Sequence, residues 1–158
     1  MTQTLQQEVE TLRQVPLFSA LDPARLKLLA FTSERLSFQS GQELFHQGDQ
    51  GDSAYVILNG TADIVVEDDG IETIVASIGQ NAVIGEIAVL CEVPRTASVR
   101  VVAPVDALKI DSQNFLAMLR EFPEMGLEVM RELANRLSVT TAELSRARAE
   151  LKATGNPT

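Results

Sequence analysis

The sequence of 158 residues contains one cysteine, one histidine and no tryptophan. Cys91 therefore has no internal disulfide partner, and it is either a small packed residue beside a turn or a reactive thiol. One histidine, far along the chain from that cysteine, excludes a small barrel of the metal-binding cupin type. No apolar run approaches the roughly 18 residues of a membrane span, and the amino-terminal residues lack the features of a signal peptide. These absences predict a cytoplasmic protein with no metal site.

Positive charge is also scarce, and one long stretch has none. The chain has 13 Lys and Arg against 22 Asp and Glu, a formal net charge of −9, and it has no Lys or Arg between Arg35 and Arg95. This balance opposes nonspecific binding to nucleic acid or anionic lipid, so neither is an expected partner. Arg95 is the first cation after the acidic stretch, which makes it the candidate contact for a bound anion.

Both ends of the chain have helical patterns. Leu5, Val9 and Leu12 lie at helical spacing, and Pro16 predicts that this first helix ends near residue 14. Asp22 followed by a proline predicts the capped start of a second helix. Asp111 predicts the cap of a third, and a long helix is expected from about residue 123 to residue 152.

The middle of the chain has the pattern of short β-strands. Runs rich in Val, Ile, Tyr and Phe begin near residue 33 and are separated by glycines every eight to twelve residues, which is typical of an antiparallel barrel or sandwich. Asp69-Gly70 stands between two β-branched runs and predicts a tight hairpin turn. Two further strands are expected at residues 98–102 and 105–110.

Residues 85–99, GEIAVLCEVPRTASV, combine features of an anion site. Gly85 permits a close backbone approach, and the turn of helix expected at residues 86–90 has unpaired N–H groups at its start. The guanidinium of Arg95 can bind two phosphate oxygens at once, which a lysine cannot. Taken singly, Glu86 and Arg95 are as well explained by a surface ion pair, and Gly85 by an ordinary turn.

This stretch closely resembles the phosphate-binding cassette of cyclic nucleotide-binding domains. Residues 48–60, GDQGDSAYVILNG, resemble the glycine-punctuated strand pair of that family, and residues 16–21, PLFSAL, resemble its entry segment. The resemblance covers roughly residues 15–152. It implies an α+β fold, an antiparallel β-roll (a jelly-roll-like barrel) flanked by N-terminal helices and a long C-terminal helix.

The resemblance also implies roles for single residues. Arg95 would bind the cyclic phosphate, Glu86 would accept a hydrogen bond from the ribose 2′-OH, and Ile87 and Ala88 would donate backbone N–H groups. Thr96 would contribute its hydroxyl and N–H. The remaining candidates would form the wall against the base, although each taken singly is better explained as an ordinary core residue: Ile64, Val75, Val83 and Ile84.

The long helix contains a second pattern. Met130, Leu137, Leu144 and Leu151 repeat every seven residues, which indicates a coiled-coil seam and a homodimer. The alternative is a helix packed on its own barrel.

Residues 133–141, LANRLSVTT, resemble the dimer helix of the bacterial catabolite activator proteins. That resemblance implies that Thr140 contacts the base in its own subunit and Thr141 reaches it from the partner subunit. Both hydroxyls favour cyclic AMP, whereas Thr96 keeps cyclic GMP open as a ligand.

The sequence thus predicts four parts: an N-terminal helix at 1–14, the β-roll with its flanking helices at 15–122, a lid or dimer helix at 123–153 and a tail at 154–158. The expected function is a stand-alone receptor for cyclic AMP or cyclic GMP that signals to an unknown protein by moving its last helix. No cofactor and no catalysis are expected, because no nucleophile–base pair is recognisable. The alternative is a structural assembly module that does not use nucleotide binding. A DNA-reading segment like that of the catabolite activators is not expected after the long helix.

Overall fold

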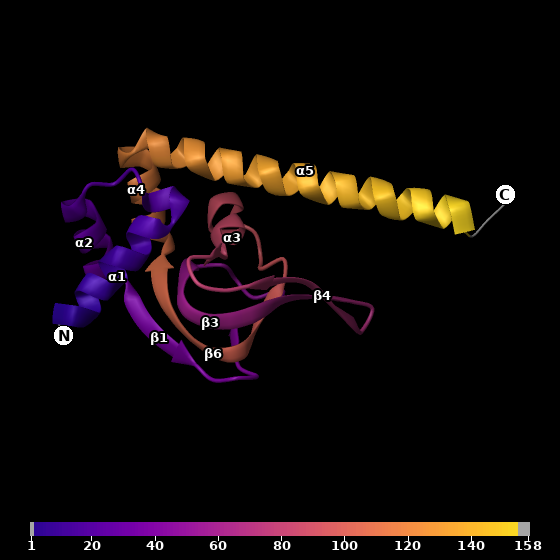
Figure 1. Cartoon of the computed structure of the whole chain (residues 1–158), viewed down its shortest axis with the longest axis horizontal. Helices are drawn as coiled ribbons and strands as arrows, with labels where there is room; N and C mark the ends of the chain where they lie inside the picture. Colours follow the sequence, from indigo (N-terminus) through magenta and orange to yellow (C-terminus); the bar gives the residue numbers. More distant parts are fainter. Residues whose placement is uncertain (1, 155–158) are drawn as a thin grey trace.

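A computed structural model describes residues 2–154 of the chain. Three helices come first: α1 (Thr2–Gln14), the short 3-10 helix η1 (Pro16–Phe18) and α2 (Pro23–Thr32). After the strands, α4 (Ser112–Glu121) and α5 (Pro123–Thr154) complete the chain (Figure 1). Of the predicted tail, Thr154 ends α5 and residues 155–158 lie outside the described part.

The predicted caps and the predicted hairpin turn are confirmed. The Asp22 carboxylate accepts from the Arg25 N–H at 2.9 Å, and the Asp111 carboxylate accepts from the Asn114 N–H at 2.8 Å. Each bond satisfies an N–H group that the first turn of a helix leaves unpaired. In the hairpin, Asp69 and Gly70 both have positive φ, 53° and 78°, which a tight two-residue turn requires.

The strands form one antiparallel sheet that rolls up without closing, which confirms the predicted fold class. Its strands are β1 (Glu34–Phe38), β2 (Glu43–Phe45), β3 (Ser53–Asp68), β4 (Ile71–Ile78), β5 (Val83–Ile84) and β6 (Ser98–Asp111). The order is β1-β6-β3-β4, with β2 paired to β6 and β5 paired to β3.

The prediction of two strands at residues 98–102 and 105–110 is wrong, because β6 continues through Pro104. Opposite the proline, β3 has register shifts between residues 57 and 62 and Gly60 has a φ of 87°. A Cβ at Gly60 would collide with the Pro104 carbonyl. The two long strands therefore bend together at this point, and the missing N–H of the proline falls where the ladder is already interrupted.

Two apolar clusters hold the molecule together. One lies inside the roll and includes Ile57, Val99 and Ala107. The other lies between the roll and the helices, where Met125 and Val129 of α5 are 0% and 6% exposed. The first turns of α5 are thus anchored on the domain.

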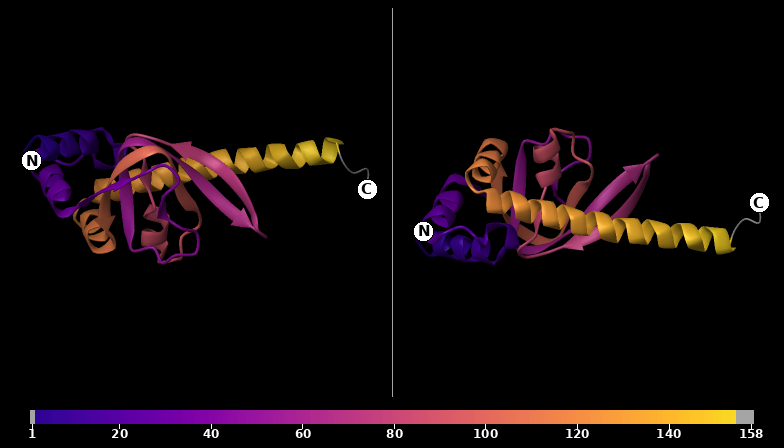
Figure 2. Two further views of the ribbon diagram at one scale, coloured as in Figure 1. Left: turned by 90° about the horizontal axis from the view of Figure 1, so that it is seen from below. Right: turned by 90° about the horizontal axis from the view of Figure 1, so that it is seen from above.

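Beyond these anchored turns, α5 extends as a single straight rod. It passes over α3 (Glu86–Cys91) and past the β3–β4 hairpin, and its distal half projects from the body of the protein (Figures 1 and 2). No helix in residues 2–154 is long and apolar enough to cross a membrane.

Candidate functional site

The site is organised around the junction of β5 and α3. Gly85 caps α3 with a φ of 83°, a conformation that a residue with a side chain adopts only under strain. A Cβ at Gly85 would lie 2.5 Å from Nη1 of Arg95 and 3.2 Å from the Ser53 carbonyl oxygen. The glycine therefore permits the close approach of the cassette arginine to the backbone.

Arg95 lies buried beside this glycine, with 4% of its surface exposed. Its Nη1 donates to the Gly85 carbonyl at 3.0 Å, and its Nη2 donates to the Ser53 carbonyl at 2.7 Å. The Phe45 ring covers one face of the guanidinium, 4.0 Å from the ring centroid to Cζ. Burial lowers the pKa of Arg95, but a guanidinium remains charged in proteins. Its Nε is buried and has no hydrogen-bond partner within residues 2–154.

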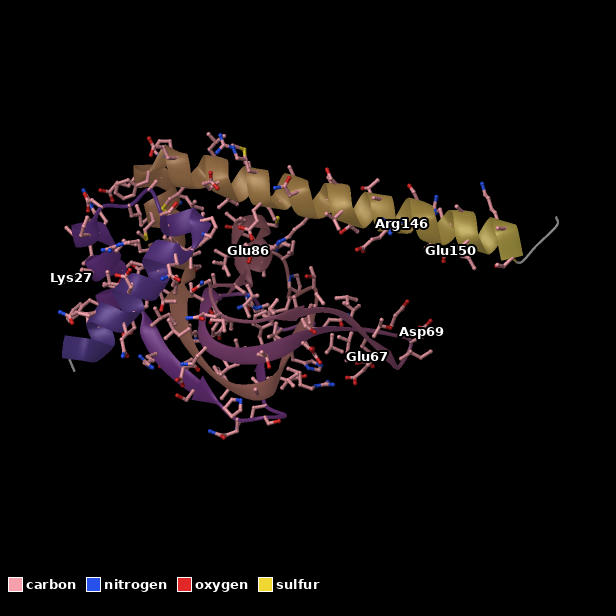
Figure 3. The ribbon with its side chains drawn as sticks, in the orientation of Figure 1. Lys27, Glu67, Asp69, Glu86, Arg146 and Glu150 are labelled. Carbon is pink, nitrogen blue, oxygen red and sulfur yellow. The ribbon has the colours of Figure 1, made fainter. Side chains whose placement is uncertain are left out.

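Glu86 begins α3 and is 5% exposed. Its Oε1 accepts from Nη1 of Arg136 on α5 at 2.5 Å, and Nη2 of the same arginine donates to Glu132 at 2.7 Å. Burial raises the pKa of Glu86, and the nearby Arg136 partly offsets that effect. The second carboxylate oxygen, Oε2, is buried without a hydrogen-bond partner among the described residues. Figure 3 shows Glu86 on α3, between the roll and α5.

A cavity of about 750 Å³ connects these groups. The roll contributes an apolar side, including Ile64, Ala76 and Ile78, and α5 contributes a charged side. Most of the predicted site residues line this cavity: Ile64, Val83, Ile84, Gly85, Glu86, Ile87, Ala88, Arg95 and Thr96. A pocket of this size with a few fixed polar groups has the dimensions of a small-molecule site.

Three predicted residues do not line the cavity. Val75 is 57% exposed. It lies in a bulge, because Ile64 pairs with Ala76 and Val65 with Ile74. Its neighbour Ala76 takes the predicted place in the wall.

Thr140 and Thr141 are exposed on α5. They come after Arg136, the last residue of the helix that lines the cavity. In this position of α5, therefore, neither threonine meets the cavity.

The sequence interpretation missed two participants, Phe45 and Arg136. Phe45 is recognisable in the sequence as an aromatic residue just before the glycine-rich stretch at 48–51. Its contact with Arg95 is not, because the two residues are 50 positions apart in the chain. The interpretation also treated Arg95 as the one cation near a bound anion. Arg131 and Arg136 line the same cavity, each paired to a carboxylate, Arg131 with Glu128 at 2.8 Å and Arg136 with Glu86.

The site thus combines a fixed, buried cation with a buried carboxylate, one oxygen of which has no partner among residues 2–154. An arginine Nε–H is a donor for anionic oxygens, and a carboxylate oxygen is an acceptor for hydroxyl groups. A ligand that has an anionic group and a neighbouring hydroxyl satisfies both. The described residues contain no group of three or more His, Cys, Asp or Glu side chains that could hold a metal ion.

Comparison with known proteins identifies the class. Residues 35–122, more than half of the chain, match the cyclic nucleotide-binding domain family. The protein belongs to this family, and its fold is that of a regulatory domain.

Individual relatives agree with this assignment. The catabolite activator protein of Thermus thermophilus is 28% identical, with a TM-score of 0.76 over 84% of this chain and 63% of that one. The regulatory domain of Toxoplasma gondii PKA, solved with cAMP, is 27% identical, with a TM-score of 0.70 over 74% of this chain and 45% of that one. The lysophospholipase nte1 of Aspergillus oryzae is 31% identical over 120 residues, 75% of this chain but 8% of that enzyme. The chain therefore spans only part of each relative.

Proposed function

We propose that this protein is a cytoplasmic receptor that binds cyclic AMP in preference to cyclic GMP and signals through the position of α5. The observation that carries the proposal is the contact between Glu86 and Arg136, which joins the ligand cavity directly to the long helix. Arg95 would hold the cyclic phosphate, and Glu86 the ribose 2′-OH. Ile87 and Ala88 would add backbone N–H groups and Thr96 its hydroxyl and N–H, with Val83, Ile84 and Ile64 against the base.

A bound ribose and Arg136 would both contact the Glu86 carboxylate, each at a different oxygen. The carboxylate has one buried oxygen in the ion pair and one without a partner in the described chain. A 2′-OH that donates to this carboxylate changes the environment of Arg136, whose side chain is 45% exposed and also bound to Glu132. Because a ligand shifts an equilibrium only through contacts that differ between two states, this shared carboxylate is where binding biases α5.

The preference for cyclic AMP is supported by the Toxoplasma relative, whose structure was solved with cAMP. Thr140 follows Arg136 by four residues and therefore lies on the same face of α5. A movement that closes the helix over the ligand would bring Thr140 toward the base, while Thr141 would reach the base of a partner subunit. The hydroxyl of Thr96 remains available to a guanine, so cyclic GMP would bind more weakly rather than be rejected.

The exposed apolar residues of α5 support a homodimer. Met130, Leu137, Leu144 and Leu151, the predicted seam, are 61%, 67%, 54% and 69% exposed. Exposed leucines at heptad spacing are the pattern by which helices pair. The downstream partner would be a protein that reads the position of α5. Nucleic acid and membrane are not expected partners, because the roll has no Lys or Arg between Arg35 and Arg95.

A second candidate function, an assembly module that does not use nucleotide, is favoured by the same exposed seam. Calorimetric titration with cyclic AMP and cyclic GMP separates the two candidates, because the assembly module binds neither. Incubation of the protein with cyclic AMP tests for hydrolysis, and we expect no linear monophosphate to form.

Movement of α5 is testable with spin labels. Asp69 at the tip of the β3–β4 hairpin and Arg146 on the distal part of α5 lie on two separate elements, both away from Glu86 (Figure 3). A variant with Asp69→Cys, Arg146→Cys and Cys91→Ser carries two labels, and dilution with unlabelled protein isolates the distance within one chain. We expect the distance distribution to shift when cyclic AMP is added. A protein that binds cyclic AMP with an unchanged distribution would refute the signalling step while leaving the receptor intact.

A further inference from the structure

Phe45 is an aromatic residue in the cavity wall that has no assigned role. It ends β2 and is half-buried, and the guanidinium carbon Cζ of Arg95 lies over its ring, 4.0 Å from the ring centroid. The same ring contacts Tyr55, with 5.8 Å between the centroids. A Cβ on Gly85 would lie 3.3 Å from its Cε2. Phe45 is thus held between the roll and the start of the cassette.

The other contacts of Arg95 hold the edges of the guanidinium and leave its faces free. Nη1 and Nη2 are bound to the carbonyls of Gly85 and Ser53, while Phe45 supplies the contact on a face. The chain just after Phe45 also holds the arginine backbone, since Gly48 N–H donates to the Arg95 carbonyl at 2.9 Å and Arg95 N–H donates to the Asp49 carbonyl at 2.7 Å. One short segment, residues 45–49, therefore fixes both the backbone and the side chain of Arg95.

We propose that Phe45 is a positioning residue that presets the Arg95 guanidinium for the anionic group of the ligand, an inference that rests on the function proposed above. A planar guanidinium stacks well on an aromatic face, and the attraction is strongest where water is excluded. With its plane fixed by the ring and two of its nitrogens held by carbonyls, the arginine keeps its Nε–H for the ligand. A preset donor loses less conformational freedom on binding.

Replacement of the ring tests this role. Phe45→Leu keeps an apolar side chain but removes the aromatic face, and we expect the affinity for cyclic AMP to fall about 5- to 30-fold. Phe45→Tyr keeps the ring and should bind within about twofold of wild type. Phe38→Leu is the matched control, because Phe38 is also half-buried and packs on the same apolar cluster as Phe45; it should leave the affinity unchanged.

Two measurements separate positioning from a general loss of packing. In an Arg95→Lys background there is no planar guanidinium to stack, so Phe45→Leu should there lower the affinity less than about threefold. In the ligand-free protein, the NMR resonance of the Arg95 Nε–H should carry a ring-current shift that is lost in Phe45→Leu and kept in Phe45→Tyr.

The outcomes distinguish the two proposals. A wild-type protein that binds neither cyclic nucleotide overturns the proposed function, and the role of Phe45 with it. A wild-type protein that binds cyclic AMP, with Phe45→Leu binding equally well, overturns the role of Phe45 alone. The positioning role is also overturned if Phe45→Leu and Phe38→Leu lower the affinity for cyclic AMP equally. It is likewise overturned if Phe45→Leu lowers the affinity as much in the Arg95→Lys background as in wild type, because the ring would then act through packing.

Discussion

Replacing Arg136 with glutamine breaks the ion pair between α5 and the cavity residue Glu86. In the native protein Arg136 Nη1 lies 2.5 Å from Glu86 Oε1, with side-chain exposures of 45% and 6%. The substitution leaves a buried carboxylate without its cation. Breaking a fully buried pair costs about 3–5 kcal/mol, whereas an exposed pair contributes about 0–1 kcal/mol. Because one partner is half exposed, we expect Arg136→Gln to lower the free energy of unfolding by about 1–2 kcal/mol.

A double-mutant cycle measured by urea unfolding at pH 7 isolates this pair. The cycle compares wild type, Arg136→Gln, Glu86→Gln and the double variant, each without ligand. With a neutral Gln at position 86, loss of the Arg136 cation leaves no unpaired buried charge. In the Glu86→Gln background, Arg136→Gln should therefore change the free energy of unfolding only slightly. Arg131→Gln is the control for stability, because Arg131 also lies on α5 and pairs with Glu128 at 2.8 Å, but its side chain is 63% exposed. It should change the unfolding free energy by less than about 0.5 kcal/mol.

The pH dependence gives an independent check with a fixed sign. Burial raises the pKa of Glu86 above its usual value, and Arg136 lowers it, so Arg136→Gln raises that pKa further. A group whose pKa is raised in the folded state favours folding when protonated, and this advantage is lost as the pH rises through the folded pKa. Wild type and Arg136→Gln should therefore be nearly equal at pH 4 and diverge toward pH 7. Two results would refute this description of the Glu86–Arg136 pair. One is that the changes in unfolding free energy of the two single variants add to that of the double variant within about 0.3 kcal/mol. The other is that the stability difference between wild type and Arg136→Gln does not change with pH.

The other predictions concern ligand affinity and assembly. Arg95→Ala should lower cyclic AMP affinity by about 30- to several-thousand-fold, because truncating one partner of a buried charge pair costs about 2–5 kcal/mol. It should also destabilise the free protein, since the Ser53 and Gly85 carbonyls lose a donor; near-native affinity by calorimetry contradicts the phosphate role. Leu137→Glu with Leu144→Glu should give a folded monomer by sedimentation, because both residues are exposed; a monomeric wild type contradicts the seam. Thr140→Ala with Thr141→Ala should reduce a roughly tenfold preference for cyclic AMP, since each hydrogen bond nets about 0.5–1.5 kcal/mol; an unchanged preference in competition titrations shows that neither threonine reads the base.

Local rules were sufficient where neighbouring residues decide the structure. The caps at Asp22 and Asp111 and the Asp69-Gly70 turn each depend on atoms a few residues apart, and all three were predictable. The same rules failed around Pro104, which lies inside the continuous strand β6 and not between two strands at residues 98–102 and 105–110. The bend that accommodates it depends on Gly60 on the facing strand, so no window of sequence around residue 104 contains the reason.

The site residues also fall into two groups, those that one local segment positions and those whose position depends on distant residues. Gly85, Glu86 and Arg95 could be assigned from one segment because a single turn of helix and the loop after it place them together. Val75, predicted for the wall against the base, does not line the cavity, whereas its neighbour Ala76 does. A bulge lies at Val75 between β3 and β4, and the regular alternation of side chains along a strand is interrupted at a bulge.

For α5 the sequence left two alternatives, packing on its own domain or pairing across a dimer. The first turns of the helix pack on the domain, and pairing across a dimer stays a proposal for its exposed residues. Met125 and Val129 are buried against the domain, and Leu133 packs on the same cluster at the next spacing of four residues. Leu137 and Leu144 come later and are exposed. Arg136 lies at the change between these two parts, where it binds Glu86. In the proposed function, α5 is anchored at one end and free at the other, and a change in the Glu86–Arg136 contact between them would move its free half. Arg136, the residue that could couple the site to α5, was therefore difficult to recognise in the sequence. Its partner Glu86 lies 50 residues away, and Arg136 belongs neither to the packed apolar face of α5 nor to the heptad seam.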